Sequence, residues 1–336
     1  MSSLRVGVAL SVTGRFARFG TQAAQGLHSW RELTDGVQVV IEDDESDPRT
    51  LRARLPALAA RCDLLLGPYS TLLARSAAEV AAAEDLLIWN HGGSGDDVQA
   101  AAPGHVVSVL SPTSRYAEPF VRHLAGREEK VPLVLAQGRG RFARQVIAGA
   151  QRHAERTGIT TVRADAPFTR DRAWDLFTAG TFEEDVDTVT AARAAPGRPR
   201  IIGAVAAGVR EFGDAVADSD GVLGVAQWFP RGHRRAEIGP SENDFLATFT
   251  RRTGTTPDYP AVQAAAAAAL AVHCAEAAGS RDREALWAAA THLRTSTMFG
   301  DFAVATEDGS QVGHRMTLVR WDEGRLDALE RRPPEP

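Results

Sequence analysis

A chain of 336 residues is too long for one compact core, so we expect about two domains of ~100–200 residues each. Hydrophobic residues make up 44% of the chain and charged residues 24%, which is typical of a globular protein. The net charge is -5 and basic residues are interleaved with acidic ones, so we expect neither nucleic acid nor an anionic membrane surface as a partner.

The chain begins MSSLRVGVAL, without an apolar leader or a cleavage site before its first strand. We expect no membrane insertion, because no apolar run approaches the ~20 residues needed to cross a bilayer. The sequence as written therefore predicts a cytoplasmic protein, or a periplasmic or extracellular lipoprotein if a leader has been removed. Cys62 and Cys274 are far apart in sequence; two unpaired thiols are expected, although a disulfide stays open.

Residues 4–110 alternate between apolar strands and helices. The run LRVGVAL at 4–10 is continuous and apolar, which is typical of a strand buried on both faces. The expected elements are strand 4–10, helix 21–34, strand 37–43, helix 49–61, strand 63–67, helix 71–84, strand 86–90 and strand 105–110. This alternation predicts a doubly wound parallel sheet with right-handed crossovers.

The pattern then restarts and predicts a second α/β unit over about 117–240. Residues 165–199 are rich in Thr, Arg and Asp, which favours a helix and a surface loop. The other expected elements are helix 113–125, strand 132–137, helix 141–157, strand 160–164, strand 201–207, helix 209–217, strand 222–228, helix 242–253, an alanine-rich helix 260–278, a helix from Asp282, and strands near 299–305 and 313–321.

Small hydroxyl and glycine residues follow two neighbouring strands. Ser70 and Thr71 come after strand 63–67, where a helix begins, and Gly93 and Ser94 come after strand 86–90. Free N–H groups and the helix dipole at such positions favour an anion, typically a carboxylate. Ser and Thr also cap helices without any ligand, and the two interpretations are compatible. The sequence therefore predicts ligand contact at these positions.

Three further side chains are candidates for ligand contact. His91 and Trp89 lie in the same stretch as Gly93, although a lone His is more often a hydrogen-bonded structural residue and a Trp that ends a buried strand more often packs. Trp228 ends strand 222–228, and aromatic side chains with a few polar groups are typical of small-molecule clefts.

The motifs of catalysis and metal binding are missing. There is no G-x-x-x-x-G-K-[ST] phosphate loop, and Asp96 occupies the position at which a nucleophile elbow needs glycine. The histidines show no H-x-x-x-H pairing, and we expect EDDES at 42–46 to be a solvated loop rather than a cation site. The sequence therefore predicts no cofactor, no metal and no enzymatic activity.

Several motifs, in their order and spacing, resemble the type I solute-binding proteins of the branched-chain amino acid and amide receptor family. These motifs are LSVTGRFARFG (10–20), EDDESDP (42–48), GPYST (67–71), GGSGD (92–96), FTRRTGTTPDYPAVQAAAAAALAV (249–272) and FGDFAVATEDGSQVGHRMTLVRW (299–321). The chain departs from the family pattern where Ala replaces a common Tyr in the second-to-last motif. The resemblance covers most of the chain and is weakest over 165–240.

The resemblance implies a two-lobed α/β fold, with each lobe a doubly wound parallel sheet and three hinge crossovers between them. Lobe one would comprise 1–116 plus 242–300, and lobe two 117–241 plus 301–336. The ligand would be closed between the lobes.

The resemblance also adds Ser11, Tyr116 and Phe142 to the expected ligand contacts, with Phe142 where the family often has Tyr. For an α-amino group, Glu211 and Asp214 are candidate partners on spacing only.

The function implied is a binding protein for an amino acid, an amide or a small carboxylate, of the type that serves an ABC transporter permease. One alternative is a cytoplasmic ligand sensor that reports to a regulatory protein, similar to the family's amide sensors. A second alternative is an enzyme on the same scaffold with His91 as general base, which would need a Ser–His pair within ~3 Å.

Overall fold

The computed structural model describes residues 3–166, 172–230 and 236–329. The chain divides into two compact units, Met1–Pro112 with Pro230–Arg315 and Thr113–Phe229 with Met316–Pro336. It therefore passes from one unit to the other three times.

The units differ from the predicted lobes mainly at residues 301–315, which were predicted to belong to lobe two. This segment belongs to the first unit, because Asp301 and Phe302 pair with strand residues of that unit and the carbonyl of Gly309 accepts a hydrogen bond from the backbone N–H of Ser108 at 2.9 Å. The other chain crossings, after Pro112 and Phe229, also precede the predicted positions.

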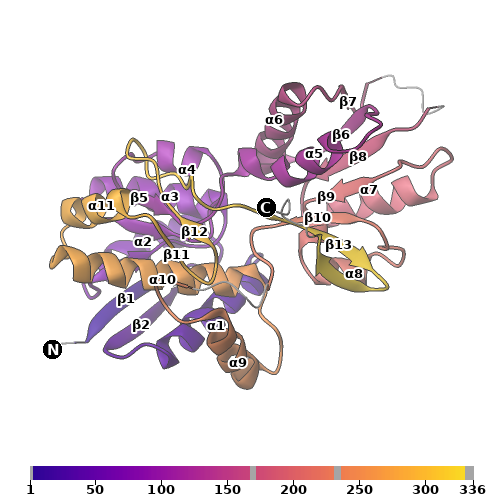
Figure 1. Ribbon diagram of the computed structural model, residues 1–336. Coiled ribbons are helices and arrows are strands. Elements are labelled where there is room, and N and C mark those ends of the chain that lie inside the picture. Colours follow the sequence, from indigo (N-terminus) through magenta and orange to yellow (C-terminus); the bar gives the residue numbers. More distant parts are fainter. Residues whose placement is uncertain (1–2, 167–171, 231–235, 330–336) are drawn as a thin grey trace, which may run out of the picture. The chain divides into compact units, whose positions relative to one another are not determined.

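The first unit is built on a five-stranded parallel sheet in the order β2-β1-β3-β4-β5 (Figure 1). Its strands are β1 (Leu4–Leu10), β2 (Val37–Asp43), β3 (Leu64–Leu66), β4 (Ile88–Asn90) and β5 (Val106–Ser108), with a separate pair β11 (Thr295–Ser296) and β12 (Asp301–Phe302). Its helices are α1 (Ala17–Glu32), α2 (Pro48–Ala59), α3 (Thr71–Ala83), α4 (Asp97–Ala100), α9 (Glu242–Thr253), α10 (Tyr259–Ala278) and α11 (Arg283–His292).

Side-chain alternation along the strands gives this sheet two apolar faces. Leu65 and Ile88 point to the face where α2 and α3 pack, and they share a buried cluster with Leu51 and Leu73 of these helices. Trp89 therefore points to the opposite face, where α10 contacts β3 and β4. Helices on both faces explain why the strands are short, continuous apolar runs.

Helix α10 is the core helix of the first unit. It is 20 residues long and contains an 18-residue window with a mean hydropathy of 1.4, so by length and composition it is apolar enough to cross a membrane, and the expectation that no run reached that length was wrong. However, 78% of the apolar window is buried inside the protein. Its alanines allow α1 to approach so closely that a Cβ added at Gly26 would lie 2.2 Å from the carbonyl oxygen of Ala261.

The second unit is built on a seven-stranded sheet in the order β14-β13-β10-β9-β8-β6-β7, in which β13 pairs antiparallel with β10 and β14, and the other pairs are parallel. Its strands are β6 (Leu133–Gln137), β7 (Thr161–Arg163), β8 (Asp175–Ala179), β9 (Ile202–Ala204), β10 (Leu223–Ala226), β13 (Thr317–Asp322) and β14 (Arg325–Ala328). Its helices are η1 (Thr113–Arg115), α5 (Glu118–Ala125), α6 (Gly140–Arg156), α7 (Phe182–Ala194), η2 (Ala206–Gly208) and α8 (Glu211–Ala215).

Strand β8 was not predicted, although it lies in the middle of this sheet between β6 and β9. All five of its residues are buried, including Asp175. The carboxylate of Asp175 accepts hydrogen bonds from Arg200 at 2.8 and 3.1 Å, which compensates the burial of its charge. The helix expected in the same stretch is α7, which begins with a capping box between Thr181 and Glu184.

Both cysteines are free thiols, as expected from the sequence. Cys274 lies on α10, and burial raises the pKa of its thiol to about 12. Cys62 is half-buried, and burial likewise raises the pKa of its thiol. Neither thiol therefore has the lowered pKa that makes a cysteine reactive.

Candidate functional site

In the first unit, the loops after β3 and β4 lie together at the N-terminus of α3. Ser70 is the N-cap of α3, and its hydroxyl accepts a hydrogen bond from the N–H of Leu73 at 3.3 Å. The hydroxyl of Thr71 accepts one from the N–H of Gly95 at 3.0 Å, which ties the loop after β4 to this helix. The first N–H groups of α3 have no intrahelical acceptor, so this corner has the backbone donors that an anion needs.

The backbone of Ser70 is strained, with φ at 88° and ψ at 146°. Such a conformation costs about 1–3 kcal/mol for a residue other than glycine and is typical of ligand sites. Two hydrogen bonds hold this conformation. The N–H of Ser70 donates to the carbonyl of Gly92 at 3.0 Å, and the carbonyl of Ser70 accepts from the N–H of Ala74 at 2.9 Å. The strain therefore fixes where the Ser70 hydroxyl and the start of α3 point.

The glycines after β4 allow this close approach. A Cβ at Gly93 would lie 2.2 Å from the Cβ of Ala74, so no other residue fits there without movement. Asn90 holds the loop, since its side chain accepts from the N–H of Gly93 at 2.8 Å and donates to the Gly93 carbonyl at 2.7 Å. Ser94 is buried, with 8% of its surface exposed. Gly93 and Ser94 therefore form a packed wall beside α3.

An aromatic group that we did not select from the sequence lies beside this corner. The rings of Phe19 and Tyr69 are stacked, with centroids 4.6 Å apart and planes at 15°. The hydroxyl of Tyr69 is hydrogen-bonded to that of Tyr259, the first residue of α10. All three side chains are half-buried, so each keeps some exposed surface. Tyr69 precedes Ser70 in the chain, and Phe19 and Tyr259 both contact Tyr69. All three residues stand inside motifs that carried the family resemblance, namely LSVTGRFARFG, GPYST and FTRRTGTTPDYPAVQAAAAAALAV, and that was the available signal.

Ser11 and the acidic segment after β2 form hydrogen bonds within the first unit. Ser11 has no exposed surface, and its hydroxyl donates to the Asp44 carboxylate at 2.6 Å. Burial raises the pKa of Asp44, and the bonds from Ser11 and Ser46 offset part of that effect. Asp43 accepts from the hydroxyl of Thr13 at 2.6 Å and from three backbone N–H groups. Within the described ranges, no group of three or more His, Cys, Asp or Glu is placed to hold a metal ion.

Trp89 and His91 are also fully enclosed in the first unit. Neither ring nitrogen of His91 nor the Nε1 of Trp89 has a hydrogen-bond partner. Burial lowers the pKa of His91 to about 4, with the backbone of Gly67 acting weakly in the opposite direction, so the ring is neutral at pH 7. The Ser–His pair that the enzyme interpretation requires is not formed. Ligand contact by Ser11, Trp89 or His91 is not supported by this geometry, because their side chains face the interior.

In the second unit, the predicted site residues are aromatic side chains that pack within it. Tyr116 is 8% exposed, and its ring meets that of Phe142 edge-on at 5.4 Å. Phe142 lies in the first turn of α6 rather than in the preceding loop, and is half-buried. Trp228 lies just beyond β10 and is 7% exposed. These three residues remain predicted ligand contacts.

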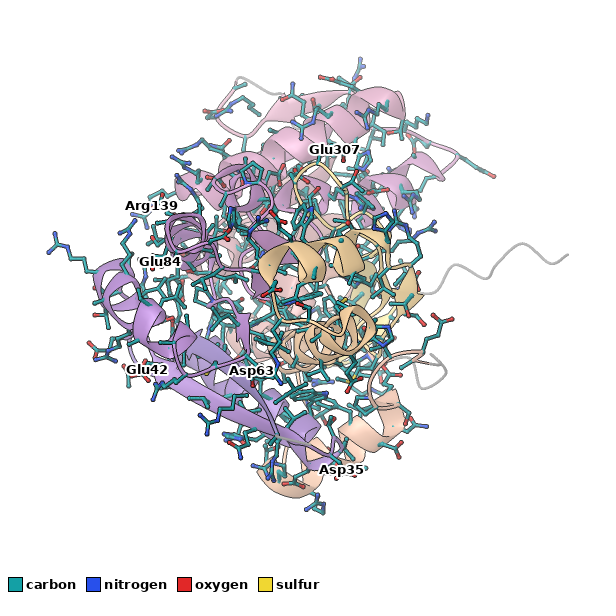
Figure 2. All side chains as sticks on the ribbon, turned by 90° about the vertical axis from the view of Figure 1, so that its left-hand side faces the viewer. Asp35, Glu42, Asp63, Glu84, Arg139 and Glu307 are labelled. Atoms are coloured by element: carbon teal, nitrogen blue, oxygen red, sulfur yellow. The ribbon has the colours of Figure 1, made fainter. Side chains whose placement is uncertain are left out.

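The acidic residues of the second unit are mostly committed to structure. Glu184 is bound by the Arg139 side chain at 2.6 Å; this arginine is 90% exposed and reaches the surface (Figure 2). Asp185 accepts from the hydroxyl of Thr178 and the N–H of Ala206, both at 2.9 Å, and burial raises its pKa to about 6. Of the two acids proposed from spacing for an ammonium group, Glu211 is half-buried and Asp214 is exposed, both on α8.

A sequence model of the periplasmic binding protein family matches residues 3–325. The chain therefore belongs to the periplasmic binding protein family, as its motifs predicted. No protein with curated annotation matches it significantly.

Solved structures share its fold at low identity. The leucine-binding protein LivK from Thermotoga maritima MSB8 is 15% identical with a TM-score of 0.81, over 97% of this chain and 98% of that one. The branched-chain amino acid transporter substrate-binding protein LivJ from Streptococcus pneumoniae, in complex with isoleucine, is 14% identical with a TM-score of 0.77, over 98% and 99%. An ABC transporter solute-binding protein from Rhodopseudomonas palustris BisB5, in complex with 3,4-dihydroxybenzoic acid, is 16% identical with a TM-score of 0.76, over 97% and 95%. The relatives are ligand-binding proteins, and the chain is a solute-binding protein rather than an enzyme.

Proposed function

We propose that this protein binds a small molecule, namely an amino acid, an amide or a small carboxylate, as the substrate-binding component of an ABC importer. In this proposal both units contact the ligand and close around it, so that ligand binding shifts the equilibrium between open and closed forms. A permease of the importer would be the protein partner.

The observation that carries the proposal is the corner formed by Ser70, Thr71 and the start of α3. It combines a strained backbone, the N–H groups of a helix's first turn and a small hydroxyl, all beside a packed glycine loop. A helix N-terminus of this kind favours a carboxylate or an amide oxygen. Without a base these features do not make a catalytic site, whereas the recognition of a small anion uses all of them.

The proposal is tested by a thermal-shift screen of amino acids, amides and small carboxylates. A ligand at 100 times its dissociation constant should add about 2.7 kcal/mol of stability and raise the melting temperature by a few degrees. Ser70→Ala should weaken the response, whereas Ser76→Ala, which removes a buried hydroxyl from the same helix away from its N-terminus, should not. Equal loss in both variants, or no response to any compound, would contradict the proposal.

Trp228 tests whether the second unit also contacts the ligand. We expect Trp228→Ala to weaken the same ligand that Ser70→Ala weakens, because both units hold it. Binding that depends on Ser70 but is unchanged by Trp228→Ala, Tyr116→Leu and Phe142→Leu would confine the site to the first unit and rule out closure around the ligand.

The cellular location belongs to the same proposal. An importer's binding component acts outside the cytoplasmic membrane, whereas a sensor that reports to a regulatory protein acts in the cytoplasm. Fractionation of the source cells with an antibody against the chain separates the two. Recovery with the cytoplasmic fraction alone would favour the sensor and remove the permease as partner.

A further inference from the structure

A cavity of about 200 Å³ lies at the C-terminal ends of α1 and α9, beside the edge strand β2 of the first unit. Its lining consists of His28, Arg31, Glu32, Val39 and Arg252. The three residues from α1 are spaced i, i+3 and i+4, so they share one face of the helix, and α9 packs against α1 (Figure 1). The cavity is smaller than the ~300–1,000 Å³ of sites for drug-sized ligands, so it suits a small ion.

The groups around this cavity carry more positive than negative charge. Glu32, the carboxylate of the lining, accepts hydrogen bonds from the guanidiniums of Arg251, at 2.6 Å, and Arg252. These two bonds lower the pKa of Glu32, so it is negatively charged at pH 7. Arg31 is exposed, and within the described residues its guanidinium has no hydrogen-bond or ion-pair partner. Three guanidiniums therefore surround one carboxylate, and that of Arg31 is free to bind a ligand.

The C-terminal ends of α1 and α9 reduce this positive potential without reversing it. A helix C-terminus is equivalent to roughly half a negative charge, whereas each guanidinium carries a full positive charge. Some of the last carbonyls are also capped, since that of Trp30 accepts from the N–H of Leu33 at 3.0 Å and that of Thr250 from the N–H of Gly254 at 2.8 Å. Three guanidiniums outweigh one carboxylate and two helix ends, so the cavity favours an anion.

His28 adds a hydrogen-bond acceptor to these donors. Its imidazole is half-buried, and burial lowers its pKa, with the guanidiniums of Arg252 and Arg31 acting in the same direction and Glu32 in the opposite one. The ring is therefore neutral at pH 7, with an N–H on one nitrogen and a lone pair on the other. A guanidinium can only donate, so an anion that accepts several hydrogen bonds and also donates one matches the lining.

We propose that this cavity binds inorganic phosphate, which accepts hydrogen bonds from the guanidiniums of Arg31 and Arg252 and donates one to the ring of His28. Guanidinium groups match phosphate oxygens in both geometry and charge. At pH 7 inorganic phosphate keeps a hydroxyl that can donate, whereas sulfate has none and a phosphate monoester, with a second pKa of about 6, has mostly lost its own. The site shares no residue with the corner at Ser70, so phosphate binding here is independent of the proposed ligand.

The test is an NMR titration of the whole chain with inorganic phosphate at pH 7, with the ionic strength held constant by chloride. The ring signals of His28 report binding, and His28→Gln identifies them among those of the nine histidines. Sulfate and glycerol phosphate are the comparison anions. Arg31→Gln and Arg252→Gln each remove one positive charge from the lining. Arg251→Gln is the matched control, because Arg251 pairs with the same Glu32 but does not line the cavity.

We expect phosphate to shift the His28 signals along a saturating curve and to raise the pKa of the ring, because the anion offsets the neighbouring guanidiniums. Sulfate and glycerol phosphate should bind about tenfold more weakly, since neither donates a hydrogen bond to the ring. Arg31→Gln and Arg252→Gln should each weaken phosphate about tenfold through the loss of a charge-assisted bond, whereas Arg251→Gln should change the affinity less than about threefold. Circular dichroism of each variant verifies that it is folded.

Three results overturn the proposal. Equal responses of His28 to phosphate, sulfate and added chloride, or no saturating response, would show general screening of the arginines rather than a site. Tighter binding of glycerol phosphate than of inorganic phosphate would show that His28 is not the acceptor and would assign the phosphate of an organic ester instead. Equal losses of affinity in Arg251→Gln and Arg31→Gln would place the anion outside the cavity. None of these results involves Ser70, so each leaves the proposed function intact.

Discussion

The region around β4 and α10 in the first unit and the region around β8 and α7 in the second bury polar groups in different ways. In the first unit, the side chains of Trp89, His91 and Gln263 are fully enclosed, and their polar nitrogen and oxygen atoms lack hydrogen-bond partners. In the second unit, the buried carboxylates of Asp175 and Asp185 each accept two or more hydrogen bonds. An unpaired neutral group costs about 1–3 kcal/mol, whereas an unpaired charge costs far more, so a neutral His is tolerated where an ion is not.

His91 and Asp185 contribute oppositely to the pH dependence of stability. The pKa of His91 is lowered in the folded state, and that of Asp185 is raised. Protonation of His91 therefore destabilises the first unit, whereas protonation of Asp185 stabilises the second, within one pH window. The predictions below separate the units, from the largest expected effect to the smallest.

Close packing of helices should be equally critical in both units. A Cβ at Gly26 would lie 2.2 Å from the carbonyl oxygen of Ala261, and one at Gly149 would lie 1.9 Å from that of Ser114. We expect Gly26→Val to destabilise the first unit, and Gly149→Val the second, by about 4 kcal/mol or more, because backbone must move. Hydrogen exchange reports each unit separately. Gln25→Val and Gln151→Val are the controls, and an effect below about 1 kcal/mol from either glycine variant would refute the packing argument.

Acid should weaken the first unit through His91. The folded pKa of about 4 lies below the ordinary value of 6.5 for histidine, so the unfolded chain binds more protons between these values and the stability contributed by His91 falls as pH falls. The loss between pH 7 and pH 4 should be about 3 kcal/mol, with little change above pH 7. Urea unfolding at several pH values, followed by hydrogen exchange, measures it. In His91→Phe the slope that His91 contributes should vanish; an unchanged slope would assign it to other groups.

Asp185 should contribute the reverse slope in the second unit. Its folded pKa of about 6 lies above its ordinary value of 3.8, so at this residue the folded state binds more protons and its contribution to stability falls as pH rises through this window. We expect Asp185 to account for a loss of about 2 kcal/mol between pH 4 and pH 7, measured as the difference between wild type and Asp185→Asn. Asp185→Asn keeps one acceptor oxygen and should remove this contribution from the curve of stability against pH. If wild type and Asp185→Asn had the same slope over this range, the hydrogen bonds to the buried carboxylate would offset the effect of burial on its pKa.

Surface ion pairs should contribute least, and equally little in each unit. Arg52 and Glu79 pair at 2.8 Å with side chains 46% and 47% exposed, and Arg163 and Asp165 pair at 3.0 Å with side chains 59% and 71% exposed. Glu79→Gln and Asp165→Asn should each change stability by less than about 0.5 kcal/mol. A larger effect in one unit, measured in 0.5 M salt as well as in low salt, would reveal a charge network on that unit alone.

Much of the fold could be predicted because local signals coincided with it. Helix α9 has the predicted bounds, since Ser241 caps it and Gly254 ends it in a left-handed conformation. The corner at Ser70 and Thr71 was predicted because a strand end and a helix cap meet there. Strand β8 was missed because it begins with Asp175, whose burial depends on Arg200, 25 positions further along the chain.

The candidate site was predicted less completely, because its contacts are distant in sequence. Tyr69 and Tyr259 are 190 positions apart, and no local pattern joins them. Ser11 and His91 each follow a strand, and the sequence did not reveal that both side chains turn inward. The hydroxyl of Ser11 turns inward to Asp44, which is 33 positions away, so its orientation is a tertiary feature.

The three passages of the chain between units set the order in which the protein is completed during synthesis. The first unit contains β1, at Leu4–Leu10, and α10, at Tyr259–Ala278, which covers one face of the same sheet. At ~5–20 residues per second, a ribosome needs roughly 10–50 s between these elements. During that interval α10 cannot yet cover the face of the sheet that carries Trp89, so the core of the first unit is completed only late in synthesis.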